Sequence, residues 1–238
     1  MLKVYGDIFS QPTRAILIFC KANGLEHEFV SVRIDKLAHV KPEFAEINPL
    51  KKLPAIDDDG FKLPESHAIM RYLAATRAGV EDHWYPKEPH ERAQIDAVLD
   101  WHHLNIRKGS METVFNAFLA ANRGLTPDLH ILKKGRQTLK NALRDLEKVW
   151  LRDPGPFVLG RSEPSIADLS IVCELMQLEV LDAKEREGFL NPCPRVRALM
   201  AAVEKATSPY FTEVHTMIRK LGKVAQAKRE EQAAGSKL

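Results

Sequence analysis

Signals for β-strands are confined to the first 77 residues of this 238-residue chain, and the segments that follow are helical in character. In the first part, apolar residues recur either at every second position, as in a strand, or at every third to fourth position, as in a helix. The expected strands span 2–5, 28–32, 54–56 and 61–63, and the expected helices span 12–22, 42–47 and 66–76. This order, βαβαββα, predicts a small α/β domain.

Local signals support this order. The last two expected strands are joined by Asp57-Asp58-Asp59-Gly60, which is a strong hairpin signal. The first expected helix begins near Pro12 and stops at Gly24, as helices with an early proline and a terminal glycine do. Its segment Ala15 to Cys20 is apolar all the way round. We therefore expect this helix to be buried on every side.

The remainder of the chain is expected to be helical. Apolar residues at helical spacing predict helices over 91–122, 128–150, 165–181, 195–207 and 210–221. The domain boundaries follow from these elements: an α/β domain over 1–77, a linker over 78–88, an all-α domain over 89–221, and a mobile polar tail over 222–238.

Composition excludes several classes of protein. With 45% hydrophobic and 28% charged residues, the chain is typical of soluble globular proteins. The net charge of +3, without a basic stripe, does not favour a nucleic-acid partner. The longest apolar run, Ala15 to Cys20, is too short to cross a membrane, and the first residues lack a secretory signal. Three cysteines without zinc-site spacing predict free thiols in a reducing compartment.

Ser10 stands directly before the buried helix, and two interpretations of it are open. A serine at this place can cap the helix N-terminus. It can also stabilise a bound thiolate, because its hydroxyl donates a hydrogen bond at the positive end of the helix dipole.

Leu53-Pro54 leads into the third expected strand. An X-Pro bond here is a common place for a cis peptide. A cis bond would leave the backbone groups of Leu53 free to pair with an extended peptide, as an added strand does. A simple turn is the alternative.

Glu65-Ser66 opens the third expected helix. The Ser66 hydroxyl and the free N–H groups of the first turn form an anion site, and Glu65 can hold an ammonium group. The pair suits the α-amino acid end of a γ-glutamyl peptide, although an ordinary helix cap is again the alternative. His102-His103 could suggest a metal, but no third ligand comes at helical spacing, so that we predict no metal site.

In their joint order these segments resemble the glutathione S-transferase family, and specifically plant-like members of the theta class. The resemblance covers residues 2–221. The matching motifs are SQPTRA at 10–15, INPLKKLPAI at 47–56, ESHAIMRYL at 65–73, DHWYP at 82–86, DWHHLNIRKG at 100–109 and SIADLSIVCELMQLEVL at 165–181. The resemblance implies a thioredoxin-like N-terminal domain and an all-helical C-terminal domain that carries the second-substrate site. It also implies a homodimer, with glutathione as co-substrate and no cofactor.

The resemblance assigns roles to single positions. Ser10 would donate a hydrogen bond to the glutathione sulfur, with Gln11 beside it in the glutathione site. Leu53 would pair with the cysteinyl backbone, and Pro54 would shape the loop. The remaining assignments are Glu65 and Ser66 for the γ-glutamyl end, His39 and Lys52 for the glycyl carboxylate, Arg107 for the second-substrate cleft, and Ser165 and Asp168 for a structural capping box.

The expected activity is conjugation of glutathione to hydrophobic electrophiles and reduction of organic hydroperoxides. A thiol transferase or dehydroascorbate reductase of the same fold would need a cysteine in place of Ser10, and Cys20 lies at the far end of the helix. A non-catalytic glutathione- or ligand-binding protein of ligandin type is the other alternative. The closing Ser236-Lys237-Leu238 is a peroxisomal address, which predicts a peroxisomal enzyme with a cytosolic pool also allowed.

Overall fold

The computed structural model describes residues 1–235 of the chain, and its N-terminal part is an α/β domain. The strands are β1 (Leu2–Gly6), β2 (Glu28–Ser31), β3 (Ala55–Asp58) and β4 (Phe61–Pro64). The helices are α1 (Gln11–Ala22), α2 (Pro42–Ala45) and α3 (Ser66–Thr76), with a 3₁₀ turn η1 (Ala38–Val40) between β2 and α2. This is the βαβαββα order that the hydrophobic periods predict, and it is the thioredoxin-like arrangement.

The four strands form one mixed sheet in the order β2-β1-β3-β4. β1 runs parallel to β2, with Val4 opposite Phe29, and antiparallel to β3, with Val4 opposite Ile56. The β3–β4 hairpin turns at Asp59 and Gly60, which have φ angles of 52° and 94°. Two positive φ angles in succession are what a tight hairpin turn of primed type requires.

Helix α1 lies between the sheet and the helical domain, so that its middle is buried on all sides. Every residue from Thr13 to Cys20 is buried, including Arg14, whose side chain is fully enclosed. Arg14 donates hydrogen bonds to the carbonyls of Ile8 and Cys173 at 3.1 Å each. Burial lowers the pKa of the Arg14 guanidinium to about 10. Since Ile8 belongs to the N-terminal domain and Cys173 to the helical domain, these bonds join the two domains near the start of α1.

The C-terminal domain begins after a connection that contains the 3₁₀ turn η2 (Asp82–Trp84). One long helical stretch then runs from residue 89 to residue 122, through α4 (Pro89–His102), α5 (Lys108–Val114) and α6 (Ala120–Asn122). Two π-helical turns, η3 (His103–Arg107) and η4 (Phe115–Leu119), interrupt it. The stretch corresponds to the single helix expected over 91–122.

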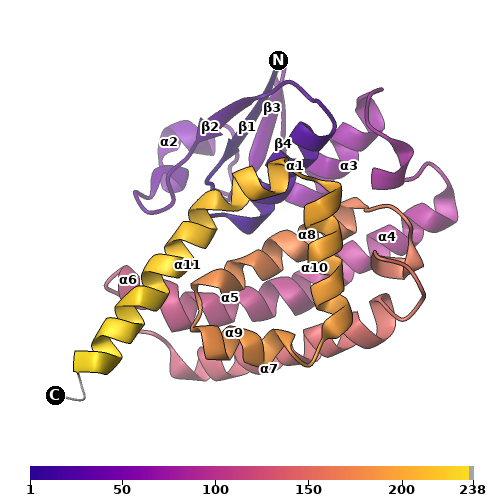
Figure 1. The fold of residues 1–238 in the computed structure, drawn as a ribbon. Helices are drawn as coiled ribbons and strands as arrows, with labels where there is room; N and C mark the ends of the chain where they lie inside the picture. The colour runs from indigo at the N-terminus through magenta and orange to yellow at the C-terminus, as the bar shows by residue number, and fades with distance from the viewer. Residues whose placement is uncertain (236–238) are drawn as a thin grey trace.

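The other helices of this domain pack around that stretch (Figure 1). They are α7 (Leu129–Asp145) with the π turn η5 (Leu146–Trp150), α8 (Ile166–Leu175) with the 3₁₀ turn η7 (Met176–Val180), α9 (Ala183–Leu190), α10 (Pro194–Ala206) and α11 (Tyr210–Gly235). A further 3₁₀ turn, η6 (Val158–Gly160), precedes α8. The helix α9 is not among those expected from the sequence.

The N-terminus of α8 carries a capping box that is buried in the core. The Ser165 hydroxyl accepts a hydrogen bond from the Ala167 N–H at 3.2 Å, and Asp168 accepts one from the Ser165 N–H at 2.8 Å. Asp168 also accepts a bond from the Val158 N–H at 2.8 Å, which ties the preceding loop to the helix. Ser165 and Asp168 are therefore structural residues in this fold.

The end of α11 departs from expectation. The sequence predicts a last helix over 210–221 and a mobile tail over 222–238, whereas the helix continues to Gly235. The extension is anchored on η7 and on the start of α9: Arg229 donates to the Val180 carbonyl at 2.8 Å, and Gln226 accepts from the Ala183 N–H at 3.3 Å. The segment is also rich in good helix formers, which polarity alone does not reveal. The predicted address Ser236-Lys237-Leu238 lies outside the described residues.

The three cysteines are free and buried. Burial raises the pKa of Cys20 and of Cys173 to about 12, so that neither thiol is ionised at neutral pH. Within residues 1–235, no helix combines the length and the hydrophobicity needed to span a lipid bilayer.

Candidate active site

Two adjoining cavities open where the N-terminal domain meets the helical domain. One has a volume of about 180 Å³ and a largely polar lining, and the other has a volume of about 410 Å³ and a largely apolar lining. Leu53 and Arg107 line both cavities, so that the two spaces meet at these residues. This arrangement suits a polar ligand in the first cavity whose one end reaches the junction, next to an apolar molecule in the second cavity.

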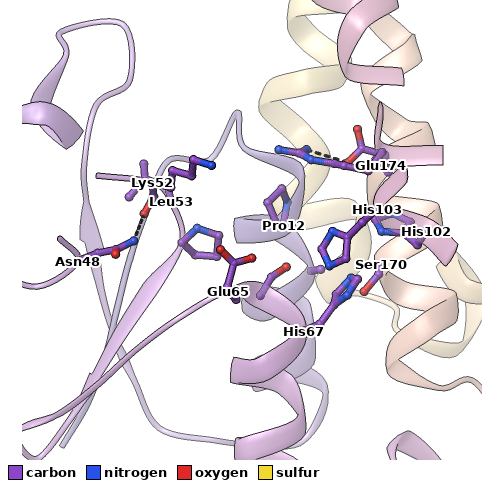
Figure 2. Close-up of a pocket in the computed structure, with 14 residues that line it drawn as sticks. Pro12, Asn48, Lys52, Leu53, Glu65, His67, His102, His103, Ser170 and Glu174 are labelled. Carbon is purple, nitrogen blue, oxygen red and sulfur yellow. Dashed lines mark hydrogen bonds and ion pairs between the residues drawn. The ribbon is translucent and has the colours of Figure 1, made fainter. Parts of the chain in front are cut away.

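The polar cavity gathers four residues that the sequence predicts for one site. Lys52, Leu53, Glu65 and Ser66 all line it. The Leu53-Pro54 peptide bond is cis, as the X-Pro position predicts. Figure 2 shows Leu53 and Lys52 on one wall, with Glu65 between them and the helices of the other wall.

Asn48 holds the loop that presents Leu53. Its side-chain amide donates to the Lys52 carbonyl at 2.7 Å, and its Oδ1 accepts from the Leu50 N–H at 3.0 Å. Asn48 is 1% exposed and lines the cavity, although sequence reasoning assigned it no role. The signal was present in Asn48-Pro49, because asparagine before proline favours such a turn.

Glu65 has an unusual backbone at the start of α3. Its φ and ψ angles are 71° and 112°, which a side chain with a Cβ rarely adopts. Such residues are retained where the surroundings hold them, and they cluster at ligand sites. The strained backbone places an exposed carboxylate beside the buried Ser66 at the helix N-terminus.

Ser10 lies at the N-cap position of α1 and lines the apolar cavity. Its backbone N–H donates to the Asp7 carbonyl at 2.8 Å, which fixes the loop. Its hydroxyl makes no capping hydrogen bond to the described chain, although the residue is only 7% exposed. The interpretation as an ordinary side-chain cap therefore does not hold, and the hydroxyl remains available to a ligand.

Arg107 belongs to a network of charge-assisted hydrogen bonds at the junction of the two cavities. Its Nη1 donates to Glu174 Oε2 at 2.8 Å and to Gln11 Oε1 at 3.1 Å. Gln11 Nε2 donates to the other oxygen of Glu174 at 3.1 Å. The Glu174 side chain is 2% exposed and the Arg107 side chain is 33% exposed, so that the buried carboxylate holds both neighbours in place.

The apolar cavity extends from Ser10 to the second π turn. Its wall includes the apolar side chains Phe9, Met111, Phe115, Phe118 and Leu119. His39 lies on this wall rather than with Lys52, which lines the polar cavity. The two cavities meet at Leu53, and the shared role of His39 and Lys52 at the glycyl carboxylate stays a prediction.

Three histidines line the polar cavity. His67 comes from α3, and His102 and His103 come from the junction of α4 and η3. Burial lowers the pKa of His67 to about 3 and that of His102 well below its ordinary value. The sequence showed His102-His103 as a pair, but it could not show that His67 from another domain joins them.

Ser170 and Glu174 are two further polar lining residues without a predicted role. Glu174 carried a recognisable signal, because it is a single acid between the apolar residues Cys173 and Leu175. A carboxylate in such a position is rarely buried unless it has a partner.

Comparisons with known proteins identify the family to which the chain belongs. A family profile described as "Glutathione S-transferase, N-terminal domain" matches residues 1–75. The chain is 45% identical to glutathione S-transferase T1 of Arabidopsis thaliana, over 96% of this chain and 94% of that protein. It is 46% identical to glutathione S-transferase T2 of the same plant over 99% of this chain, but it spans only 40% of that longer protein.

Among solved structures, the human glutathione transferase theta-2, in complex with glutathione and an unknown ligand, matches with a TM-score of 0.85. The identity is 33%, and the match covers 96% of this chain and 91% of the human chain. The chain is therefore a glutathione transferase: it belongs to the glutathione S-transferase family and, within it, to the theta class.

Proposed function

We propose that this transferase activates glutathione through Ser10. In this proposal the peptide lies in the polar cavity, with its γ-glutamyl end at Glu65 and Ser66 and its cysteinyl backbone along Leu53. Its sulfur then reaches the junction of the two cavities, next to Ser10. The observation that carries the proposal concerns Ser10 at the N-terminus of α1. The residue is buried, and its hydroxyl makes no capping hydrogen bond to the described chain.

Modest energies suffice for this activation. A free thiol has a pKa of about 8.5, so that little of it is ionised at neutral pH. Lowering that pKa by about two units corresponds to about 2.7 kcal/mol. A charge-assisted hydrogen bond contributes about 1.5–3 kcal/mol, and a helix N-terminus adds about 0.3–1 kcal/mol. The hydroxyl and the helix together can hold the sulfur as a thiolate without a cofactor.

The second substrate would bind in the apolar cavity. There the thiolate attacks an electrophilic carbon, and a leaving group departs with the electron pair of the broken bond. With an organic hydroperoxide, the thiolate attacks the terminal oxygen, and the alcohol leaves as the O–O bond breaks. A second glutathione then displaces the sulfenic oxygen as water, so that the products are an alcohol, water and oxidised glutathione.

Two further parts of the proposal concern assembly and location. The theta-class resemblance favours a homodimer in which the N-terminal domain of one subunit faces the C-terminal domain of the other. The tripeptide Ser236-Lys237-Leu238 favours import into peroxisomes, where hydroperoxides arise. A fluorescent fusion with and without these three residues tests the location, and an unchanged distribution would contradict peroxisomal import.

The decisive experiment compares Ser10→Ala with Ser66→Ala. We expect Ser10→Ala to lower kcat at least tenfold, with little change in the KM for glutathione, because it removes only the bond to the sulfur. Ser66→Ala should mainly raise that KM. The ultraviolet absorbance of the bound thiolate, titrated against pH, gives the pKa of the glutathione thiol. This pKa should rise in Ser10→Ala and stay unchanged in Ser66→Ala.

The alternative of a ligand-binding protein has one observation in its favour, the apolar cavity of about 410 Å³. The same titration distinguishes it. Glutathione that binds without any thiolate absorbance at neutral pH would support the binding protein and would remove Ser10 from the mechanism.

A further inference from the structure

His67, His102 and His103 form a cluster in the lining of the polar cavity. Figure 2 shows the three imidazole rings gathered together, with Ser170 beside them. One ring nitrogen from each of the three can be chosen so that all three lie within 4.8 Å of one another. Two chain segments from different domains therefore bring three imidazole nitrogens close together.

The burial of the cluster makes it unusual. His67 and His102 are each 4% exposed, and neither ring nitrogen of His102 has a hydrogen-bond partner in the described chain. His215, another buried histidine, keeps one partner, because its Nδ1 lies 2.9 Å from the Phe211 carbonyl, whereas its Nε2 has none in the described chain. Buried polar groups are paired almost everywhere in native proteins, and a histidine with both ring nitrogens unpaired calls for an explanation such as a bound ion.

Local backbone and distances are compatible with a metal ion. His102 ends α4, and His103 begins the π turn η3, a distortion that is frequent at functional sites. Zinc binds imidazole nitrogen at about 2.0–2.1 Å, so that two ligands of one tetrahedral ion lie about 3.3 Å apart. Because the three nitrogens lie within 4.8 Å of one another, they need to approach by at most about 1.5 Å, and rotation of the exposed His103 side chain can contribute to this.

The surrounding charges do not exclude a cation. Arg107 and Arg71 are the nearby positive groups. Arg107 is paired with the buried Glu174 at 2.8 Å, and Arg71 is paired with Asp96 at 2.7 Å. Each guanidinium charge is therefore compensated by a carboxylate.

We propose that His67, His102 and His103 bind one divalent transition-metal ion, with Zn²⁺ as the best fit. Three imidazoles favour zinc, copper, nickel or cobalt over magnesium or calcium, which prefer oxygen ligands. Three protein ligands leave a fourth position for water or for a carboxylate of a molecule in the polar cavity. The site is additional to the activation of glutathione by Ser10, which requires no metal.

The test is a titration of the full-length protein, stripped with a chelator, free of any histidine tag, and without glutathione. Calorimetry with Zn²⁺ should give one equivalent per chain, and Co²⁺ should give visible absorption bands of a tetrahedral nitrogen site. His103→Gln and His67→Gln should each weaken binding at least tenfold. His103 is the more informative position, because its exposed side chain can change without disturbing the core.

His130→Gln is the matched control, because His130 is an exposed histidine on α7, away from the cavity lining. It should leave zinc affinity and the cobalt spectrum unchanged. A thermal-unfolding scan should show Zn²⁺ raising the Tm of the wild type and of His130→Gln, but not of His103→Gln. Absence of zinc binding at millimolar concentration, or equal binding by the wild type and His103→Gln, would overturn the proposal.

Discussion

Glu174 is a buried carboxylate on α8, a helix whose residues are buried along its whole length. It accepts hydrogen bonds from Arg107 and from Gln11, which stand on two other elements. One side chain thus fixes the polar junction between the two cavities. The positions of Gln11 and Arg107 depend on it, although neither residue is near it in the sequence.

We expect Glu174→Gln to lower the free energy of unfolding by about 1–3 kcal/mol, since it weakens two charge-assisted hydrogen bonds. Arg107 is partly exposed, which keeps the loss below that of a fully buried ion pair. A double-mutant cycle with Arg107→Gln in urea should give a coupling energy of at least about 0.5 kcal/mol. Additive effects of the two substitutions would show that the pair contributes nothing to stability.

A second prediction at the residue scale concerns Asp168 and the pH dependence of stability. Burial raises its pKa to about 6, against hydrogen bonds from Val158 and Ser165 that lower it. Between pH 4 and 6, Asp168 is therefore largely protonated in the native state. In the unfolded chain it is largely ionised over the same range, because the pKa of an unperturbed aspartate is about 3.9. Because the native state binds more protons in this window, the stability contributed by Asp168 falls as pH rises from about 4 to about 6.

The measurement compares the wild type with Asp168→Asn, which cannot titrate at this position. The difference between their unfolding free energies, wild type minus variant, should decrease from pH 4 to pH 6 and then level off. All other groups titrate in both proteins and cancel. A constant difference over this range would mean that Asp168 is ionised throughout.

At the scale of elements, the sequence predicts what depends on local periodicity. The strands, the hairpin at Asp59-Gly60 and the buried α1 follow from apolar spacing and turn residues. Helix α9 has only eight residues and a largely polar sequence, so that no apolar period marks it. The extension of α11 depends on Arg229 meeting a carbonyl of η7, which is a contact that no local pattern contains.

Helix α11 gives a prediction of its own, because it passes very close to η7 at Gly222. A Cβ at this position would lie 2.4 Å from the Glu179 carbonyl oxygen, which belongs to the backbone. Gly222→Ala should therefore lower the free energy of unfolding by about 1–3 kcal/mol, because overpacking outweighs the gain in helix propensity.

Gly188 on α9 is the matched control. It is exposed, and a Cβ there meets no atom of the described chain within 4 Å. Gly188→Ala should raise stability by about 0.5–1 kcal/mol through helix propensity alone. Urea unfolding of the two variants should thus move in opposite directions, and a stabilising Gly222→Ala would contradict the close contact between α11 and η7.

At the scale of the whole molecule, the site exists only where the two domains meet. The sequence identifies Ser10, Leu53, Glu65 and Ser66 as candidates, because each lies in a motif with its own local chemistry. Arg107 is a candidate only through the family resemblance. It does not identify their neighbours, since the contact between His67 and His102 and that between Gln11 and Glu174 join distant segments. Tertiary packing alone brings these pairs together.

The proposed homodimer can be tested on the exposed surface of the long helical stretch. Leu104 in η3 is 73% exposed, and the same helical stretch carries site residues such as Arg107. In a dimer that joins the N-terminal domain of one subunit to the C-terminal domain of the other, this side chain would be buried. Leu104→Arg should then dissociate the dimer, because an unpaired charge in an apolar contact costs more than the contact contributes.

Leu129 at the start of α7 is the matched control, with an exposure of 74%. Light scattering coupled to gel filtration should give twice the chain mass of 26.9 kDa for the wild type and for Leu129→Arg. Leu104→Arg should give a single chain mass at the same concentration. If both leucine variants stay dimeric, η3 lies outside the subunit contact. If the wild type is already a monomer, the exposed Leu104 belongs to no subunit interface, and each chain carries a complete pair of cavities on its own.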